Sequence, residues 1–379
     1  MSQVFGESVG TPLKIKLHGS RSSFAIAQSM IGVCGSNRHR CPQVTHPMPP
    51  EITELQIRTG QSGSITRNLS PRQGRNSPHG WCLPRWRGHQ ATVEEPIYSQ
   101  SPPPWDDPSA DVRTMKIFIS ADIEGVAGIS HWDEASLHKP DFSIFQEQMT
   151  AEVNAACEGA LEAGATEIWV KDGHGTGRNL LASRLPPPTR LIRGWSGHPY
   201  QMLQELDETF SAVVMIGYHA AAGAAGNPLS HVLTKGLAEL RINGRHASEF
   251  LLNAYTAALL KVPVALVSGD QALCDNVVAV NPSIQTVPVK IGVGDSTVSL
   301  HPGEAVRRIR EQVAHALQTD LTSCGLDLPE QFRVELRYKE HTDAYRNAFY
   351  PGAKLKDACI IVFETPDYFE VLRFLLFTA

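Results

Sequence analysis

The fold is decided by the stretch Ile117-Phe118-Ile119-Ser120-Ala121-Asp122-Ile123-Glu124-Gly125, in which an apolar run ends in two acids and a glycine. The apolar residues predict a buried strand, and the glycine predicts a turn directly after it. Side chains two positions apart point to the same side of a strand, so Asp122 and Glu124 are expected to lie together. Two anions held this close repel each other unless a cation lies between them. The pair therefore indicates a cation site, although acids at a strand-to-helix turn also serve as helix caps.

Two later apolar runs end in a comparable way. The first, Glu167–Lys171, leads into Asp172-Gly173-His174-Gly175, and the second, Ser211–Ile216, leads into Gly217-Tyr218-His219. Taken singly, a histidine between glycines is as often a turn residue, and a histidine that closes a strand can simply bond a loop. Carboxylates and imidazoles at three strand ends of one sheet favour a single shared metal site over three separate structural roles.

Strands alternate with helices along residues 115–379, and this alternation is typical of an α/β fold. Connections of this length imply right-handed crossovers and a mostly parallel sheet covered by helices. Sites in such sheets form at the carboxyl ends of the strands, where the acids and histidines lie. One α/β domain is expected, and a small C-terminal α+β subdomain from about residue 320 is compatible with the pattern. The predicted strands are Lys116–Ala121, Glu167–Lys171, Ser211–Ile216, Leu237–Ile242, Val262–Val267, Ile284–Val289, Phe332–Tyr338 and Ala358–Phe363. The predicted helices are 142–163, Tyr200–Leu206, Ala247–Leu260, Gln271–Val280, Gly303–Leu317 and a last one from about Pro366.

Residues 1–114 differ from the rest of the chain in composition. They contain 13 of the 26 prolines and carry 12 Lys and Arg against 8 Asp and Glu, whereas residues 115–379 carry 22 against 31. No sustained helical or strand periodicity precedes Lys116, so this segment is expected to be a disordered, low-complexity extension. Met115, directly before the first convincing strand, also suits a mis-assigned start upstream of the natural one. A transit peptide is the weaker alternative, because Glu7 and the length of the segment argue against it.

The composition indicates which classes of binding partner and which cellular compartment to expect. No run approaches 18 uninterrupted apolar residues, so no membrane-spanning helix is expected. Residues 115–379 are acidic, which disfavours nucleic acid and anionic membranes as partners. The basic segment with Trp81 and Trp86 gives only a weak nucleic-acid signal without a folded platform. The seven cysteines show no paired spacing, which favours free thiols in a reducing compartment and hence a cytoplasmic protein.

Two further residues complete the candidate set. Ser230-His231 follows the segment from Ala220 to Pro228, which is rich in alanine and glycine. A flexible loop that delivers one histidine to a metal centre suits a catalytic acid or base better than a further ligand. Glu249 lies in the first turn of the helix predicted from Ala247. An acid there is favoured by the helix dipole alone, but the periodicity also allows it to face the sheet.

Taken together, these fragments resemble the DppA-type zinc-dependent D-aminopeptidase family. The run from Met115 to Gly125 is similar to the opening of that family, and the later fragments follow in the family order. They are Asp172-Gly173-His174-Gly175 with Asn179-Leu180, Gly217-Tyr218-His219-Ala220, Ser230-His231, and Ile242-Asn243-Gly244 through Glu249 to Asn253-Ala254-Tyr255. The resemblance spans essentially all of residues 115–379. Each fragment is short, but their combination is specific.

The resemblance implies a dinuclear zinc site. It assigns Asp122 as the carboxylate that bridges two Zn²⁺ ions in each subunit, and the other protein ligands as Glu124, His174, His219 and Glu249. It assigns His231 as the catalytic histidine, which would protonate the leaving amine or stabilise the tetrahedral intermediate. Two neighbouring metal ions can generate hydroxide near neutral pH and polarise the scissile carbonyl. Family members form ring-shaped decamers, so the resemblance also implies a homo-oligomer.

The expected function is a metal-dependent aminopeptidase that releases N-terminal, D-configured residues from short peptides or amides. Two alternatives stay open: a metallohydrolase of another amide or of a phosphoester, and a metal- or peptide-binding protein without turnover. No phosphate-binding glycine loop of the P-loop type supports the phosphoester. Two departures from the family pattern are an alanine-rich segment one residue longer than expected before His231, and Ser248 where glycine is more common. Neither removes a ligand, but both leave the substrate stereochemistry less secure than the metal site.

Overall fold

The computed structural model describes residues 115–379 in full and, before them, the backbone of four short strands. The chain divides into two units, residues 1–101 and 102–379. The first unit contains an antiparallel sheet in the order β1-β2-β3-β4, formed by β1 (Gln3–Ser8), β2 (Thr11–Lys16), β3 (Leu55–Arg58) and β4 (Ser64–Arg67). The sequence analysis did not find these strands, because segments of four to six residues are too short to show periodicity. The rest of the extension that was expected to be disordered lies outside the described residues.

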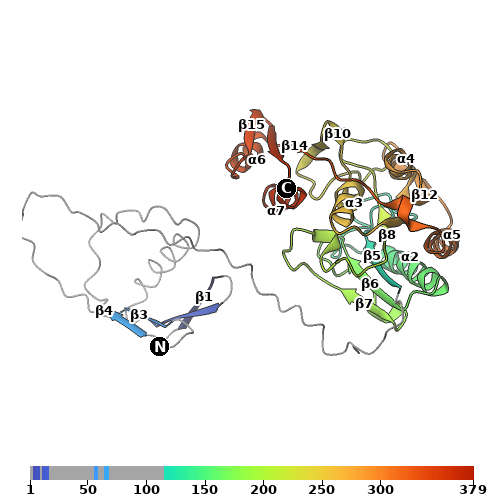
Figure 1. Ribbon diagram of the computed structural model, residues 1–379, viewed down its shortest axis with the longest axis horizontal. Helices are drawn as coiled ribbons and strands as arrows, with labels where there is room; N and C mark the ends of the chain where they lie inside the picture. Colours follow the sequence, from blue (N-terminus) through green and yellow to red (C-terminus); the bar gives the residue numbers. More distant parts are fainter. Residues whose placement is uncertain (1–2, 9–10, 17–54, 59–63, 68–114) are drawn as a thin grey trace, which may run out of the picture. The chain divides into compact units, whose positions relative to one another are not determined.

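A seven-stranded sheet forms the centre of the second unit (Figure 1). Its order is β13-β12-β11-β8-β5-β6-β7, and every neighbouring pair is parallel except β12 and β13. This confirms the predicted α/β class with a mostly parallel sheet. The predictions missed β7 and β13, which are only four residues long. The strands are β5 (Lys116–Ala121), β6 (Glu167–Asp172), β7 (Thr189–Ile192), β8 (Ala212–Tyr218), β11 (Val264–Asp270), β12 (Gln285–Val293) and β13 (Ser296–Ser299).

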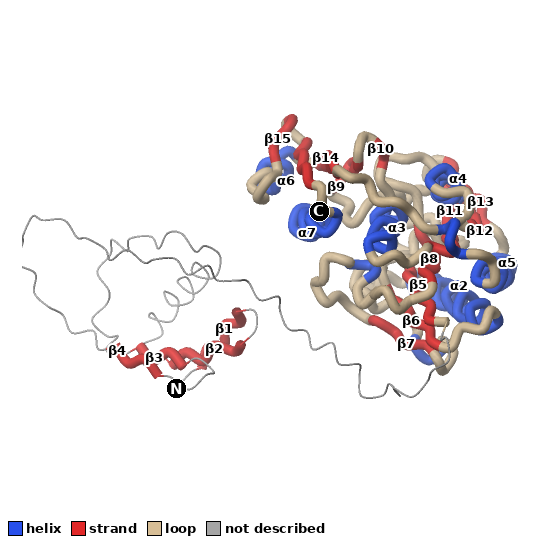
Figure 2. Tube along the Cα trace, viewed as in Figure 1, coloured by secondary structure: helices blue, strands red, loops and turns tan. Residues whose placement is uncertain are grey.

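Both faces of the central strands β5, β8 and β11 are buried, which explains why these strands are mostly continuous apolar runs. Successive residues of β5 point to opposite faces. Ile117 and Ile119 pack with α2 (Phe142–Glu162) and α5 (Pro302–Leu317), which lie against each other on one face (Figure 2). Phe118 belongs to the other core, with α3 (Glu249–Leu259) and α4 (Gln271–Val280). The sheet is therefore the middle layer between two apolar cores.

A second sheet lies beside this second core and is antiparallel throughout, in the order β10-β9-β14-β16-β15. Helix α3, which spans Glu249–Leu259, packs between the two sheets with α7 as a neighbour. The sheet confirms the α+β part of the expected fold, but it takes β9 and β10 from well before residue 320. Pairing between strands so distant in sequence leaves no local pattern to read. The elements are β9 (Leu237–Ile242), β10 (Arg245–His246), β14 (Phe332–Tyr338), β15 (Lys354–Asp357), β16 (Ile360–Thr365), α6 (His341–Asn347) and α7 (Tyr368–Thr378).

The remaining helical elements of the second unit are short 3₁₀ turns. Within residues 115–379, 3₁₀ turns are present at η1 (Ala182–Arg184), η2 (Gln201–Leu203) and η3 (Leu321–Cys324), and η2 lies within the helix predicted for Tyr200–Leu206. Among the described residues, none of the helices combines the length and apolar character needed to cross a bilayer.

The order of the strands fixes where a site can form. The chain runs outward from β5 through β6 to β7, and then returns to the other side of β5 with β8. Loops that follow the strands on either side of such a reversal diverge and leave a crevice at the carboxyl ends. The strands β8, β5 and β6 are adjacent, so the residues that follow them meet at one place.

Candidate metal centre

The end of β5 is held against the end of β8 by backbone contacts. Asp122 N donates to Ile216 O and Gly125 N donates to Gly217 O, both at 2.8 Å. A Cβ atom on Gly125 would lie 1.7 Å from the carbonyl oxygen of Tyr218, so only glycine fits. At the end of β8, Gly217 adopts a φ of +71°, a backbone conformation that favours glycine at that position as well. The turn thus fixes the backbone that carries both acids.

The loop after β6 is ordered by an acid that does not join the cluster. The carboxylate of Asp172 accepts from Asn179 N, Leu180 N and Asn179 Nδ2. Asn179 Nδ2 also donates to His174 O at 2.6 Å. Asp172 therefore shapes the loop that presents His174. Asn179 and Leu180, which the sequence analysis noted, supply the hydrogen-bond donors of this loop.

Helix α3 presents Glu249 from its first turn. Ser248 is the N-cap, and its Oγ accepts from Leu251 N at 3.4 Å. A serine at this position is a good cap, so the departure from glycine in the sequence supports the helix that carries Glu249. Glu249 Oε1 also accepts from Leu233 N at 2.7 Å. This bond ties the turn after His231 to the start of α3.

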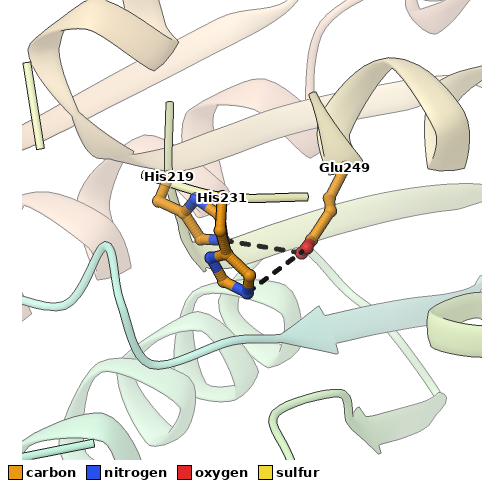
Figure 3. A group of neighbouring side chains, drawn as sticks. All are labelled: His219, His231 and Glu249. Atoms are coloured by element: carbon orange, nitrogen blue, oxygen red, sulfur yellow. Dashed lines mark ion pairs between the residues drawn. The ribbon is translucent and has the colours of Figure 1, made fainter. Parts of the chain in front are cut away.

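Six side chains converge at the carboxyl ends of the strands in two groups that could each hold a metal ion. In the first group, His174 Nδ1 lies 3.3 Å from Asp122 Oδ1 and 3.0 Å from Glu124 Oε2. In the second, His219 Nε2 lies 3.6 Å from Glu249 Oε2, and His231 Nε2 lies 3.8 Å from Glu249 Oε1 (Figure 3). Asp122 joins the groups, because its Oδ2 lies 3.4 Å from His219 Nε2.

Backbone carbonyls set the orientation of all three imidazoles. The outer nitrogens of the rings lie within hydrogen-bonding distance of carbonyl oxygens: His174 Nε2 at 2.7 Å from Ala135 O, His219 Nδ1 at 2.9 Å from Ala220 O, and His231 Nδ1 at 3.1 Å from Leu229 O. A carbonyl can only accept, so each of these nitrogens carries a proton. Once the ring is neutral, as it is when it binds a metal ion, the other nitrogen directs its lone pair into the cluster. This is the arrangement of metal-ligating histidines, whose second N–H bonds a carbonyl or carboxylate.

The electrostatics of the cluster favour positive charge among the carboxylates. Burial and the neighbouring Glu124 raise the pKa of Asp122 to about 8. Burial disfavours the charged forms of Glu124 and His174, but their mutual attraction outweighs it, so the pKa of Glu124 lies well below 4.5 and that of His174 well above 6.5. Burial also opposes the charge on His219, but Glu249 raises the pKa of this ring to about 10. A cation bound by these groups would take the place of the protons that they attract.

Three buried atoms of the cluster make no hydrogen bond, although charged side chains lie 3.0–3.9 Å from them. They are both carboxylate oxygens of Glu124 and the Nε2 of His219. Buried polar atoms are nearly always paired, and an unpaired one calls for a ligand that the protein itself does not supply. Carboxylate oxygens and imidazole nitrogens are ligands that suit Zn²⁺. The residues therefore fit a metal centre on the chemistry of their own donor atoms.

The cluster opens into a cavity of about 730 Å³. Asp122, Glu124, His174, His231 and Glu249 line it, whereas His219 is buried behind His231 and does not. The side chain of His231 is 15% exposed and that of His219 is 0% exposed. His231 thus has access to a bound molecule that His219 lacks.

A buried polar network behind Glu124 was not found from the sequence. Lys290 Nζ donates to Glu124 O and to Ile129 O, and Asn227 Nδ2 donates to Glu124 O and to Asp270 Oδ2. Asp270 also accepts from Ala220 N at 2.9 Å. The network anchors both ends of the alanine-rich segment, which the sequence suggested as flexible. Lys290 directly follows the apolar run 284–289, and this position in the sequence was the signal of a buried charge.

The structure brings all six candidate residues together, and comparisons with known proteins show which family the chain belongs to. A profile of the D-aminopeptidase family matches residues 115–377. A D-aminopeptidase of Bacillus subtilis (strain 168) is 31% identical over 264 residues, which cover 69% of this chain and 96% of the relative.

A solved structure is similar over the same extent. It is described as "Zn-dependent D-aminopeptidase DppA from Bacillus subtilis, a self-compartmentalizing protease" and matches with a TM-score of 0.66 at 29% identity, over 69% of this chain and 96% of its own. The resemblance noted from the sequence is confirmed, as is the expectation of an aminopeptidase-type hydrolase. On this evidence, the chain belongs to the D-aminopeptidase family.

Proposed function

We propose that this protein is a dinuclear zinc aminopeptidase that releases N-terminal D-amino acids from short peptides or amides. The observation that carries the proposal is the set of unpaired buried donor atoms on Glu124 and His219, at a cluster of three carboxylates and three imidazoles. The Zn-dependence and the D-aminopeptidase name of the related Bacillus subtilis protein support the choice of metal and substrate.

The geometry supports a division of the ligands between two ions. Glu124 and His174 would hold one ion, and His219 and Glu249 would hold the other. Asp122 directs one oxygen at each group, which suits a carboxylate that bridges the two ions. When bound, the ions would polarise the scissile carbonyl and lower the pKa of a water molecule.

The protein's own residues would position the substrate and move protons. The α-amino group of the substrate would be attracted by the carboxylates that line the cavity, which would select a free N-terminus. His231 lies at the open side, and its Nε2 points toward Glu124 and Glu249 rather than toward solvent. We assign this nitrogen as the group that takes a proton from the attacking water and passes it to the leaving amine.

We also propose a homo-oligomer in the cytoplasm. Tyr345, Phe349 and Phe377 are 62%, 73% and 68% exposed on α6, on the turn after it and on α7. Exposed aromatic side chains gathered in this way are typical of protein interfaces. The four cysteines that the structure describes are free thiols, which fits a reducing compartment. Light scattering of the native protein tests the assembly, and a monomer would contradict it.

Metal content and a substrate panel test the function. The purified protein should contain about two zinc ions per chain and should hydrolyse D-Ala-p-nitroanilide faster than its L-isomer. A chelator should abolish the activity, and zinc should restore it. Hydrolysis of p-nitrophenyl phosphate alone would indicate a phosphoesterase. Two bound metal ions without hydrolysis of D- or L-peptides would indicate a binding protein instead.

A further inference from the structure

Two lysines line the cavity, and they differ in their partners. Lys139 forms an ion pair with Asp133 at 3.0 Å. Lys235 forms no ion pair with any residue that the structure describes, and its Nζ lies 3.4 Å from the centroid of the Trp132 ring. Glu124 and Asp133 attract this ammonium and Lys339 repels it, all at longer range. Lys235 therefore presents a positive charge to the cavity that has no anionic partner.

The turn that carries Lys235 is fixed to the metal centre. Leu233 adopts a φ of +57° and donates its N–H to Glu249 Oε1. Thr234 Oγ1 accepts from Gly236 N at 3.2 Å, which closes the turn around Lys235. The backbone of Lys235 is thus held at a defined place relative to Glu249, and a substrate bound at the metal centre would meet the ammonium.

Trp132 lies between His231 at the metal centre and the ammonium of Lys235 and contacts both. The ring of Trp132 lies edge-on to that of His231, with centroids 5.2 Å apart, and Lys235 lies over the face of Trp132. The ammonium is consequently within about 9 Å of the His231 ring. In the proposed mechanism His231 meets the leaving amine, so the rest of the leaving fragment would lie on the side of Trp132 and Lys235.

We propose that Lys235 binds the C-terminal carboxylate of the leaving fragment and so makes the enzyme selective for short peptides with a free carboxylate. This inference rests on the proposed function, because it needs a peptide whose N-terminus lies at the metal centre. Each residue adds about 3.5 Å to an extended chain. The ammonium is therefore within reach of the carboxylate of a dipeptide or a tripeptide.

The protein needs such a cation because its other charges disfavour an anionic substrate. Residues 115–379 have nine more acidic than basic residues, and three carboxylates surround the metal centre. A carboxylate that enters this field requires a positive partner close by. Lys235 suits this role better than Lys139, whose charge is already paired.

Paired substrates that differ only in the terminal charge test the inference. The zinc-loaded protein and its Lys235→Met variant are compared on D-Ala-Gly and D-Ala-Gly-amide, with kcat and KM measured separately. A charge-assisted hydrogen bond is worth roughly 1.5–3 kcal/mol, so the variant should lose about tenfold or more of its kcat/KM on D-Ala-Gly. On the amide it should lose less than about threefold, because no such bond is made. Lys235→Arg should retain most of the selectivity, since it keeps the charge.

Lys139→Met is the matched control, because this lysine lines the same cavity. Its ratio of activities on the free dipeptide and the amide should equal that of the unaltered protein. An equal loss on both substrates in Lys235→Met would show that the lysine only supports Trp132 and would overturn the inference. No loss on either substrate would overturn it as well.

Binding without turnover separates this inference from the proposed function. Calorimetric titration of D-Ala-Gly and its amide into the His231→Ala protein, with and without Lys235→Met, measures the carboxylate contact directly. If the unaltered protein hydrolyses no peptide, the proposed function fails whatever the titration shows. If hydrolysis is observed and the titrations show no difference between the two ligands, only the role of Lys235 fails.

Discussion

His219 and His231 stack face to face, with ring centroids 4.4 Å apart and planes within 10° of parallel. Both rings direct Nε2 at Glu249, but His219 is fully buried and His231 lines the cavity. Burial and the neighbouring His219 lower the pKa of His231, whereas Glu249 overcomes burial to raise that of His219. One ring of the stack is thus suited to hold a metal ion, and the other to exchange a proton with a substrate.

This stack leads to a prediction on the two single variants. His219→Ala should lose bound metal, because it removes a ligand whose Nε2 has no other partner. His231→Ala should keep its metal and lose at least about 100-fold in kcat, the usual contribution of a general acid. Metal analysis and steady-state kinetics of both variants provide the check. A metal-free His231→Ala protein would show that His231 is a ligand, which its distance to Glu249 also permits.

Asp122 is predicted to be the ligand whose loss costs most. Its two oxygens face different histidines, so Asp122→Asn should weaken both metal positions, whereas Glu124→Gln should weaken one. The asparagine side chain keeps the size of the aspartate and can still accept from Ile123 N. Metal content after dialysis against a weak chelator measures the difference. Equal retention of metal in the two variants would argue against a bridging role.

Gly125→Ala should destabilise the protein by at least about 2 kcal/mol, since the added methyl group meets the backbone of β8 rather than a flexible side chain. Denaturant unfolding measures the change in the free energy of unfolding. Gly325→Ala is the control, because the nearest atom to its added Cβ lies 3.6 Å away and its backbone is unstrained. A Gly125→Ala protein as stable as the control would contradict the close approach of β5 and β8.

Glu152 predicts a dependence of stability on pH. Burial in α2 raises its pKa to about 7 from 4.5, although Gln148 and Ala127 donate to it. Between these two values the unfolded chain releases the proton while the folded chain keeps it. The free energy of unfolding therefore falls as the pH rises from 4.5 to 7, and the loss is complete above pH 7.

Glu152→Gln removes this titration. At pH 8 the variant should be more stable than the unaltered protein by up to about 3 kcal/mol, and at pH 4 the two should be equal. Urea unfolding at both pH values, with a chelator present so that metal loss does not intervene, gives the comparison. The exposed Glu147 of the same helix serves as the control, and Glu147→Gln should show no gain at pH 8. A gain that does not depend on pH would contradict the explanation.

A protein that starts at Met115 should retain metal content and activity. All six residues of the cluster follow this position, and the match to the family begins at it. The measurement compares zinc content and kcat/KM of the shortened and full-length chains. A shortened chain that folds, as judged by circular dichroism, but loses activity would assign a role to residues 1–114.

The sequence predicted the parts of the site that follow strands. Asp122, His174 and His219 come directly or nearly so after apolar runs, and a parallel sheet brings the ends of adjacent strands together. It could not predict which strands are adjacent, because the order of β8, β5 and β6 depends on contacts between distant segments. The stack of His219 on His231 follows from that order and from the path of the loop between them.

The same limit applies to residues that act through the backbone. Lys290 and Asn227 both donate to the backbone carbonyl oxygen of Glu124. A sequence motif lists side chains and cannot reveal a contact to a backbone atom. Lys235 and Trp132 are far apart in sequence and meet only at the cavity. β9 was predicted as a strand, but its partner β14 lies about a hundred residues later in the chain.

The hydrogen bond from Leu233 N to Glu249 makes a proposed metal ligand part of the turn that carries Lys235. With the roles proposed for Glu249 and Lys235, metal binding and recognition of the far end of the substrate would be mechanically linked. Any shift of the Glu249 carboxylate is therefore passed directly to Leu233 and to the turn that follows it. Attempts to redesign which peptides are accepted by altering residues 232–236 should for this reason change metal affinity as well, so selectivity and metal retention need to be optimised together.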